Sequence, residues 1–115
     1  MGIIARIKQA SGGGAPVQTL TAAATLYVDA STSRALVSGS TNCTAIDSGD
    51  DILPGRMLTL TRSGSSIPTF TNTAGTTTAG QMDFGMSGTT FQLTDSVSLV
   101  QRSDGSWGRQ SSPFN

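Results

Sequence analysis

The stretch Pro54–Arg62, which reads PGRMLTLTR, carries the clearest strand pattern in the chain. Pro-Gly is typical of a turn, and the residues after it alternate between aliphatic side chains and threonines. Successive side chains of a strand point to opposite faces, so Leu58 and Leu60 share one face, while Met57 lies on the other with the threonines. The stretch therefore predicts a half-buried strand that directs Leu58 and Leu60 into a core.

Similar short apolar or β-branched runs, separated by turn residues roughly every 8 to 12 positions, continue from Val17 onward. This spacing predicts an all-β domain, built as a short-stranded sandwich, a barrel or an intertwined β module. The predicted strands are 17–21, 25–29, 34–38, 43–47, 56–62, 68–71, 81–84, 90–94, 97–102 and 106–110.

The only tryptophan, Trp107, follows the turn sequence Ser-Asp-Gly at 103–105. A three-residue loop there places Gln101 opposite Trp107, which then shares an apolar face with Val97 and Leu99. A two-residue loop instead places Trp107 opposite Arg102, where a cation–π contact forms. The first register gives the more consistent apolar face and makes Trp107 an anchor in a core or subunit interface. That predicted apolar set is Leu58, Leu60, Val97, Leu99 and Trp107.

Residues 1–16 differ from the β domain at 17–115. Three isoleucines and two basic residues precede a glycine-rich hinge, which predicts an N-terminal arm that docks on another protein surface. A frayed terminus is the alternative interpretation. The predicted docking residues are Ile3, Ile4, Arg6, Ile7 and Lys8.

The composition predicts self-association and excludes several functions. In 115 residues, Leu, Ile, Val and Phe number only 23. Such a thin core predicts a homo-oligomer in which each chain completes its neighbour's core. Seven basic residues balance seven acidic ones, which argues against binding nucleic acid through its phosphates. No apolar run approaches the roughly 20 residues of a membrane span.

The residues available for catalysis are few. The chain has no histidine and no glutamate, so a Ser-His-Asp triad or a His/Cys zinc site cannot be built. Cys43 stands alone, which leaves no intrachain disulfide. The Asp-Ser-Gly-Asp-Asp run at 47–51 favours a solvated turn over a calcium loop. We therefore expect no enzyme activity, no cofactor and no metal.

The order of PGRMLTL at 54–60, a Thr/Gly-rich middle, DSVSLV at 95–100 and DGSW at 104–107 resembles the small β modules of tailed-bacteriophage virion proteins. Such modules occur in tail fibres and in head decoration (cement) proteins, commonly as homotrimers. The chain is short and has no repeated shaft, which favours a decoration protein over a long fibre.

This resemblance implies a structural protein of the virion, made in the host cytoplasm and bound to the major capsid protein on the capsid surface as a homotrimer that stabilises the head. A dimer stays open. The alternative is a receptor-binding tip on a tail fibre that binds host saccharide. In that case Trp107 stacks on a sugar while Asp104 and Arg109 bind its hydroxyls.

Overall fold

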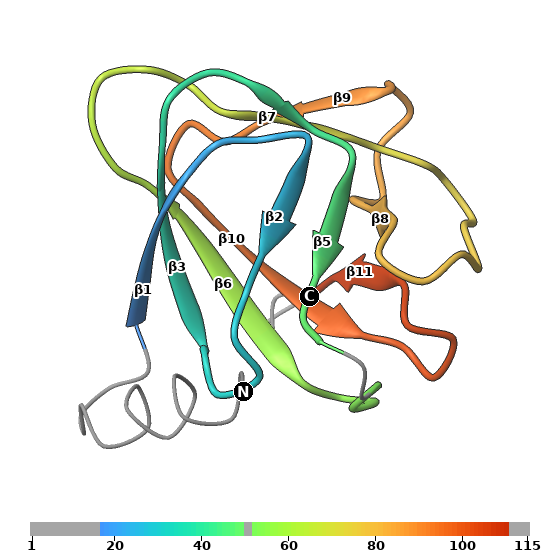
Figure 1. The fold of residues 1–115 in the computed structure, drawn as a ribbon. Helices are drawn as coiled ribbons and strands as arrows, with labels where there is room; N and C mark the ends of the chain where they lie inside the picture. Colours follow the sequence, from blue (N-terminus) through green and yellow to red (C-terminus); the bar gives the residue numbers. More distant parts are fainter. Residues whose placement is uncertain (1–16, 50–51, 111–115) are drawn as a thin grey trace.

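The computed structural model describes residues 17–49 and 52–110 (Figure 1). This part of the chain is all-β, as the sequence predicts, and forms eleven strands in three sheets. The strands are β1 (Val17–Thr21), β2 (Thr25–Tyr27), β3 (Arg34–Ser38), β4 (Asn42–Cys43), β5 (Ala45–Asp47), β6 (Met57–Arg62), β7 (Thr69–Thr71), β8 (Met82–Asp83), β9 (Thr90–Gln92), β10 (Ser96–Gln101) and β11 (Trp107–Arg109).

The first seven strands wind as a parallel coil. β3 lies parallel between β1 and β6, β5 lies parallel to β2, and β7 lies parallel to β4. Each turn of the chain therefore places a strand beside the matching strand of the turn before it. Parallel neighbours need a crossover connection, and here each crossover is itself made of short strands in the other two sheets.

Antiparallel strands close the C-terminal end of this coil. β10 pairs antiparallel with β6, and β9 pairs antiparallel with β7. β11 and β8 then extend the largest sheet, whose order is β1-β3-β6-β10-β11-β8 (Figure 1). The other end of the sheet finishes at β1, which has one strand neighbour in the described part of the chain.

One predicted strand proved to be two. The prediction treated 43–47 as continuous, but the chain turns a corner at Thr44, between β4 and β5, which belong to different sheets. The carbonyl oxygen of Ala24 holds the corner by accepting from the backbone N–H of Thr44 at 2.8 Å and from its hydroxyl at 3.0 Å. A local alternation pattern does not reveal such a corner, because the inward side chains Cys43 and Ile46 are apolar on both sides of it.

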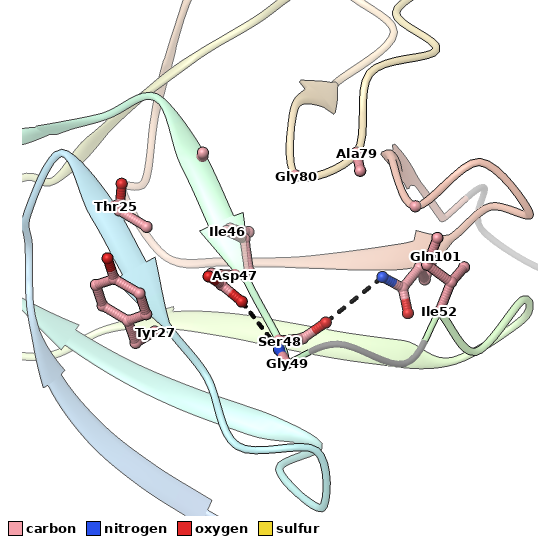
Figure 2. Close-up of a pocket in the computed structure, with 12 residues that line it drawn as sticks. Thr25, Tyr27, Ile46, Asp47, Ser48, Gly49, Ile52, Ala79, Gly80 and Gln101 are labelled. Atoms are coloured by element: carbon pink, nitrogen blue, oxygen red, sulfur yellow. Dashed lines mark hydrogen bonds between the residues drawn. The ribbon is translucent and has the colours of Figure 1, made fainter.

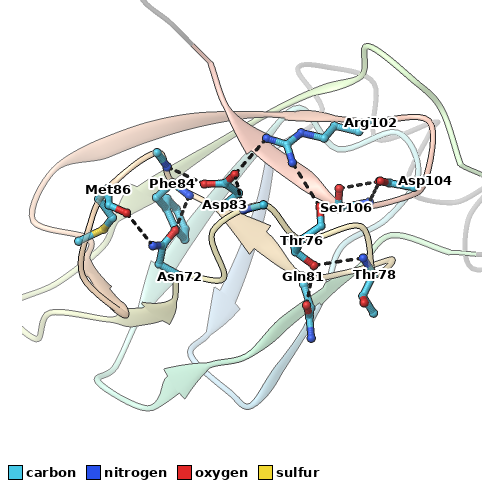
Figure 3. A network of polar contacts seen from close by, with 12 residues as sticks. Asn72, Thr76, Thr78, Gln81, Asp83, Phe84, Met86, Arg102, Asp104 and Ser106 are labelled. Atoms are coloured by element: carbon cyan, nitrogen blue, oxygen red, sulfur yellow. Dashed lines mark hydrogen bonds and ion pairs between the residues drawn. The ribbon is translucent and has the colours of Figure 1, made fainter.

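The long connection between β7 and β9 is held by a buried amide. The Asn72 side chain donates to the carbonyl oxygens of Met86 at 3.2 Å and Gly88 at 2.6 Å, and accepts from the N–H of Phe84 at 2.7 Å (Figure 3). Met82 and Phe84, which lie in this connection, are fully buried. The polar Thr/Gly-rich segment is thus ordered by a few buried anchors.

The core lies inside the coil and confirms the predicted inward residues. Leu58, Leu60, Leu99 and Trp107 have no exposed surface, and Val97 is buried. A single chain encloses them, so these residues belong to the core and need no subunit interface for burial. The remaining buried hydrophobic residues are Ala22, Leu26, Val28, Ala35, Val37, Cys43, Ile46, Phe70, Met82, Phe84 and Leu93.

Candidate functional site

The hairpin around Trp107 has the three-residue loop that the sequence favours. Gln101 pairs with Trp107, and Arg102 N–H donates to the carbonyl of Ser106 at 2.8 Å. Gly105 takes φ = +88°, the left-handed conformation that this loop requires. The register directs the indole inward, and Trp107 is 0 % exposed.

This burial corrects the alternative in which Trp107 stacks on a sugar, because a stacking platform needs an open face. Its two proposed partners make local contacts. Asp104 Oδ1 accepts from the N–H of Ser106 at 2.9 Å and from its hydroxyl at 2.6 Å (Figure 3). The bond from the hydroxyl has the largest effect in lowering the pKa of Asp104, and the bond from the N–H lowers it further. Arg109 is exposed and lies with Cζ 5.7 Å from the centre of the Phe91 ring.

Arg56 is a polar anchor that sequence reasoning missed. Its Nη2 donates to the carbonyl oxygens of Asp29 at 2.6 Å and Thr32 at 2.9 Å, so it ties the start of β6 to the loop between β2 and β3. Its Cζ lies 5.8 Å from the centre of the Trp107 ring. Burial lowers the pKa of Arg56, and the charge of Asp29 opposes that shift. The role of Arg56 is structural support beneath the hairpin.

A groove of about 390 Å³ lies on the outer face of the sheet formed by β2 and β5 (Figure 2). Thr25 and Tyr27 line it from β2, and their register partners Ala45 and Asp47 line it from β5. Tyr27 is 66 % exposed, the largest value among the large hydrophobic side chains in the described residues.

The opposite wall of the groove comes from segments that are distant in the sequence. Ala79, Gly80, Gln101 and Gly105 contribute to it, and Ile52, which is closer to β5 in the sequence, lines it as well. Gly80 is fixed against β5 because its carbonyl oxygen accepts from the N–H of Ile46 at 2.9 Å. The groove thus forms where the 79–80 loop and the tip of the Trp107 hairpin meet sheet β2–β5.

The polar groups of the groove are only partly engaged. Asp47 Oδ1 accepts from the N–H of Gly49 at 3.0 Å, an ordinary turn contact. Gln101 Oε1 accepts from the N–H of Leu53 at 3.1 Å, while its Nε2 reaches Ser48 Oγ at a long 3.5 Å. Among the described residues, no hydrogen bond engages Asp47 Oδ2 or the Thr25 hydroxyl, which leaves both available to a ligand.

A second feature is the free edge of β1, the edge at which no strand of the described residues pairs. The Ala22 N–H donates to Ser38 on the β3 side at 2.7 Å. Since alternate peptide groups point to opposite edges, Thr19 N–H points away from β3. The inward side chain of Leu20 is only partly buried, whereas its register partner Val37 is fully buried. Within the part of the chain that the structure describes, the first turn of the coil therefore leaves backbone groups and part of the core uncovered.

The predicted docking residues Ile3, Ile4, Arg6, Ile7 and Lys8 lie outside the described residues. Their segment joins the chain directly at Val17, the first residue of β1, which is 47 % exposed. The free β1 edge and the predicted arm are therefore adjacent in the chain.

The groove had a weak signal in the sequence. In a strand Leu26-Tyr27-Val28, burial of the two aliphatic residues requires that Tyr27 point outward. Its neighbour Asp47 could not be identified, because parallel pairing of β2 with β5 leaves no local pattern. Within 17–49 and 52–110, there is no group of three or more His, Cys, Asp or Glu side chains able to hold a metal ion.

No helix in the described ranges is long and apolar enough to cross a membrane. Comparisons with protein families, with curated proteins and with solved structures find no match to this chain.

Proposed function

We propose that this protein is a structural protein of a phage virion, a capsid decoration (cement) protein that binds the outer capsid surface as a homotrimer and stabilises the head. The observation that carries the proposal is the free edge of β1, whose outward backbone groups and partly buried Leu20 are covered by no strand among the described residues. The predicted arm precedes this strand in the chain. An exposed strand edge is a template for pairing with another chain.

The proposed mechanism combines two kinds of contact. An extended segment added beside β1 gains main-chain hydrogen bonds, and its side chains cover Leu20. The isoleucines of residues 1–16 add apolar burial at a neighbouring chain or at the major capsid protein, worth roughly 25 cal/mol for each Å² removed from water. Both contacts tie neighbouring subunits together, which is what resistance to internal pressure requires.

The test is binding of the purified protein to undecorated capsids, measured by co-sedimentation. Deletion of residues 1–12 should abolish binding. Thr19→Pro should weaken it, because proline removes an N–H from the free edge without removing a bond to β3. Ser65→Pro, in an exposed turn, is the control and should bind normally. Unchanged binding after the deletion refutes docking by the arm.

Two further measurements separate the remaining alternatives. Microscopy of intact particles distinguishes the capsid surface from the tail end, where a receptor-binding tip would lie. Sedimentation of the isolated protein reports its oligomeric state, and a stable monomer contradicts the homotrimer.

A further inference from the structure

We propose that the groove on the outer face of β2 and β5 is a binding site for a neutral saccharide. This site is separate from the free β1 edge, so it can exist whether or not the protein decorates a capsid. It also differs from the hairpin residues considered above, since Tyr27 takes the place of the buried Trp107 as the aromatic surface.

The groove brings an aromatic ring and a carboxylate together. Tyr27 and Asp47 are register partners on adjacent parallel strands, whose backbones lie about 4.8 Å apart. Both side chains therefore stand on the same outer face, and Figure 2 shows them side by side. Thr25 adds a hydroxyl on the same strand as the tyrosine, two residues away.

Small residues keep the groove open. Ala45, Ala79 and Gly80 line it, and a methyl group added at Gly80 would lie 3.6 Å from Ala45 Cβ and 3.3 Å from the carbonyl oxygen of Ile46. Larger side chains at these positions would fill the space between the sheet and the 79–80 loop. The volume of about 390 Å³ is at the lower end of the range of roughly 300–1,000 Å³ for small-ligand sites. It suits a mono- or disaccharide.

The chemistry of the lining matches the two kinds of surface on a sugar ring. A pyranose has an apolar face of C–H groups, which can lie on the exposed ring of Tyr27, and a rim of hydroxyls that donate and accept hydrogen bonds. Asp47 Oδ2 accepts from such hydroxyls as a charged partner, and the Thr25 hydroxyl can donate or accept. Gln101 and Ser48 also line the groove, but both side chains are buried and contact each other at 3.5 Å.

Other ligand classes fit less well. No arginine or lysine lines the groove among the described residues, and the carboxylate of Asp47 repels an anion such as phosphate. A hard metal ion takes about six or more oxygen ligands, and among the described residues of the lining Asp47 is the one acidic side chain. A purely apolar ligand would leave Asp47 and Thr25 desolvated without partners. A cation can contact the ring of Tyr27 and the carboxylate of Asp47, so a cationic probe is part of the test.

The test is saturation-transfer NMR on the full chain with glucose, galactose, mannose, N-acetylglucosamine and their common disaccharides, each at millimolar concentration. Choline and inorganic phosphate serve as cationic and anionic probes. We expect transfer to at least one neutral sugar, with C–H protons of one ring face most strongly saturated. Tyr27→Ala should weaken binding about fivefold to tenfold, whereas Tyr27→Phe, which keeps the ring, should stay within about threefold.

Three further variants locate the site. Ala45→Leu should abolish binding by filling the groove, and Asp47→Asn should weaken it. Met57→Ala removes another exposed apolar side chain, from the outer face of the large sheet, and should bind as the unaltered protein does. Circular dichroism of each variant confirms folding. The proposal is overturned if no neutral sugar shows transfer, if only choline or phosphate binds, or if a folded Ala45→Leu variant binds as before.

Discussion

Replacing Gly105 by alanine tests the packing of the Trp107 hairpin, and Gly55 provides a matched control. Both glycines have φ = +88°, a conformation that costs an L-residue about 1–2 kcal/mol. An added methyl group at Gly55 meets no atom within 4 Å. At Gly105 it would lie 2.8 Å from Ala79 Cβ and 3.1 Å from Ile52 Cδ1. Gly105→Ala therefore adds a steric overlap to the conformational cost that Gly55→Ala carries alone.

The expected costs in unfolding free energy follow from these surroundings. Alanine also lowers the conformational entropy of the unfolded chain, which stabilises the folded state by about 0.4–1 kcal/mol. The net loss of unfolding free energy for Gly55→Ala should therefore be about 1 kcal/mol. Gly105→Ala should cost about 2–4 kcal/mol, since overpacking adds about 1–3 kcal/mol. Urea unfolding with comparison of midpoints and slopes measures both values. The double variant Gly105→Ala/Ala79→Gly should recover part of the loss. Equal costs for Gly55→Ala and Gly105→Ala would refute the tight contact.

Three other predictions follow from buried or charged groups. Asn72→Ala should destabilise by about 2–4 kcal/mol in urea unfolding, because it breaks three bonds and leaves a buried N–H without a partner, whereas the exposed Asn42→Ala should cost less than about 1 kcal/mol. The pKa of Asp83 is lowered by the N–H groups of Gly85 and Gly75, so stability should fall as pH drops below about 4, and Asp83→Asn should flatten that fall in acid titrations. Burial raises the pKa of the Cys43 thiol, so a thiol reagent should label native protein far more slowly than protein in urea, and fast native labelling would contradict its burial.

Local patterns predicted the strands well because alternation depends only on neighbouring residues. The bounds of β1 and β3 match the predicted segments 17–21 and 34–38. The loop before Trp107 was also predictable, because only the three-residue register gives the indole the same face as Val97 and Leu99. In both cases a wrong register would turn apolar side chains toward water, so the sequence itself discriminates between the choices.

Parallel pairing left no comparable local signal. Val17 pairs with Arg34, and Arg34 pairs with Thr59, so the turns of the coil differ in length and show no repeating sequence. Two features depend on this long-range pairing. They are the hydrogen bond from Arg56 to the β2–β3 loop and the adjacency of Tyr27 and Asp47. The groove was therefore missed although the outward direction of Tyr27 was predictable.

The geometry of the β1 edge links the arm to the proposed oligomeric state. If the β1 edges of two chains pair with each other, they are related by a two-fold axis and bond each other's backbone groups. This pairing gives a dimer and leaves no free edge for a third subunit. A closed trimer instead needs a head-to-tail contact, in which a different segment of one chain lies beside β1 of the next. Residues 1–16 are the segment joined to this edge. Deletion of residues 1–12 should therefore convert a trimer to monomers in sedimentation, whereas a dimer that survives the deletion would show direct β1 pairing and refute the arm-linked trimer.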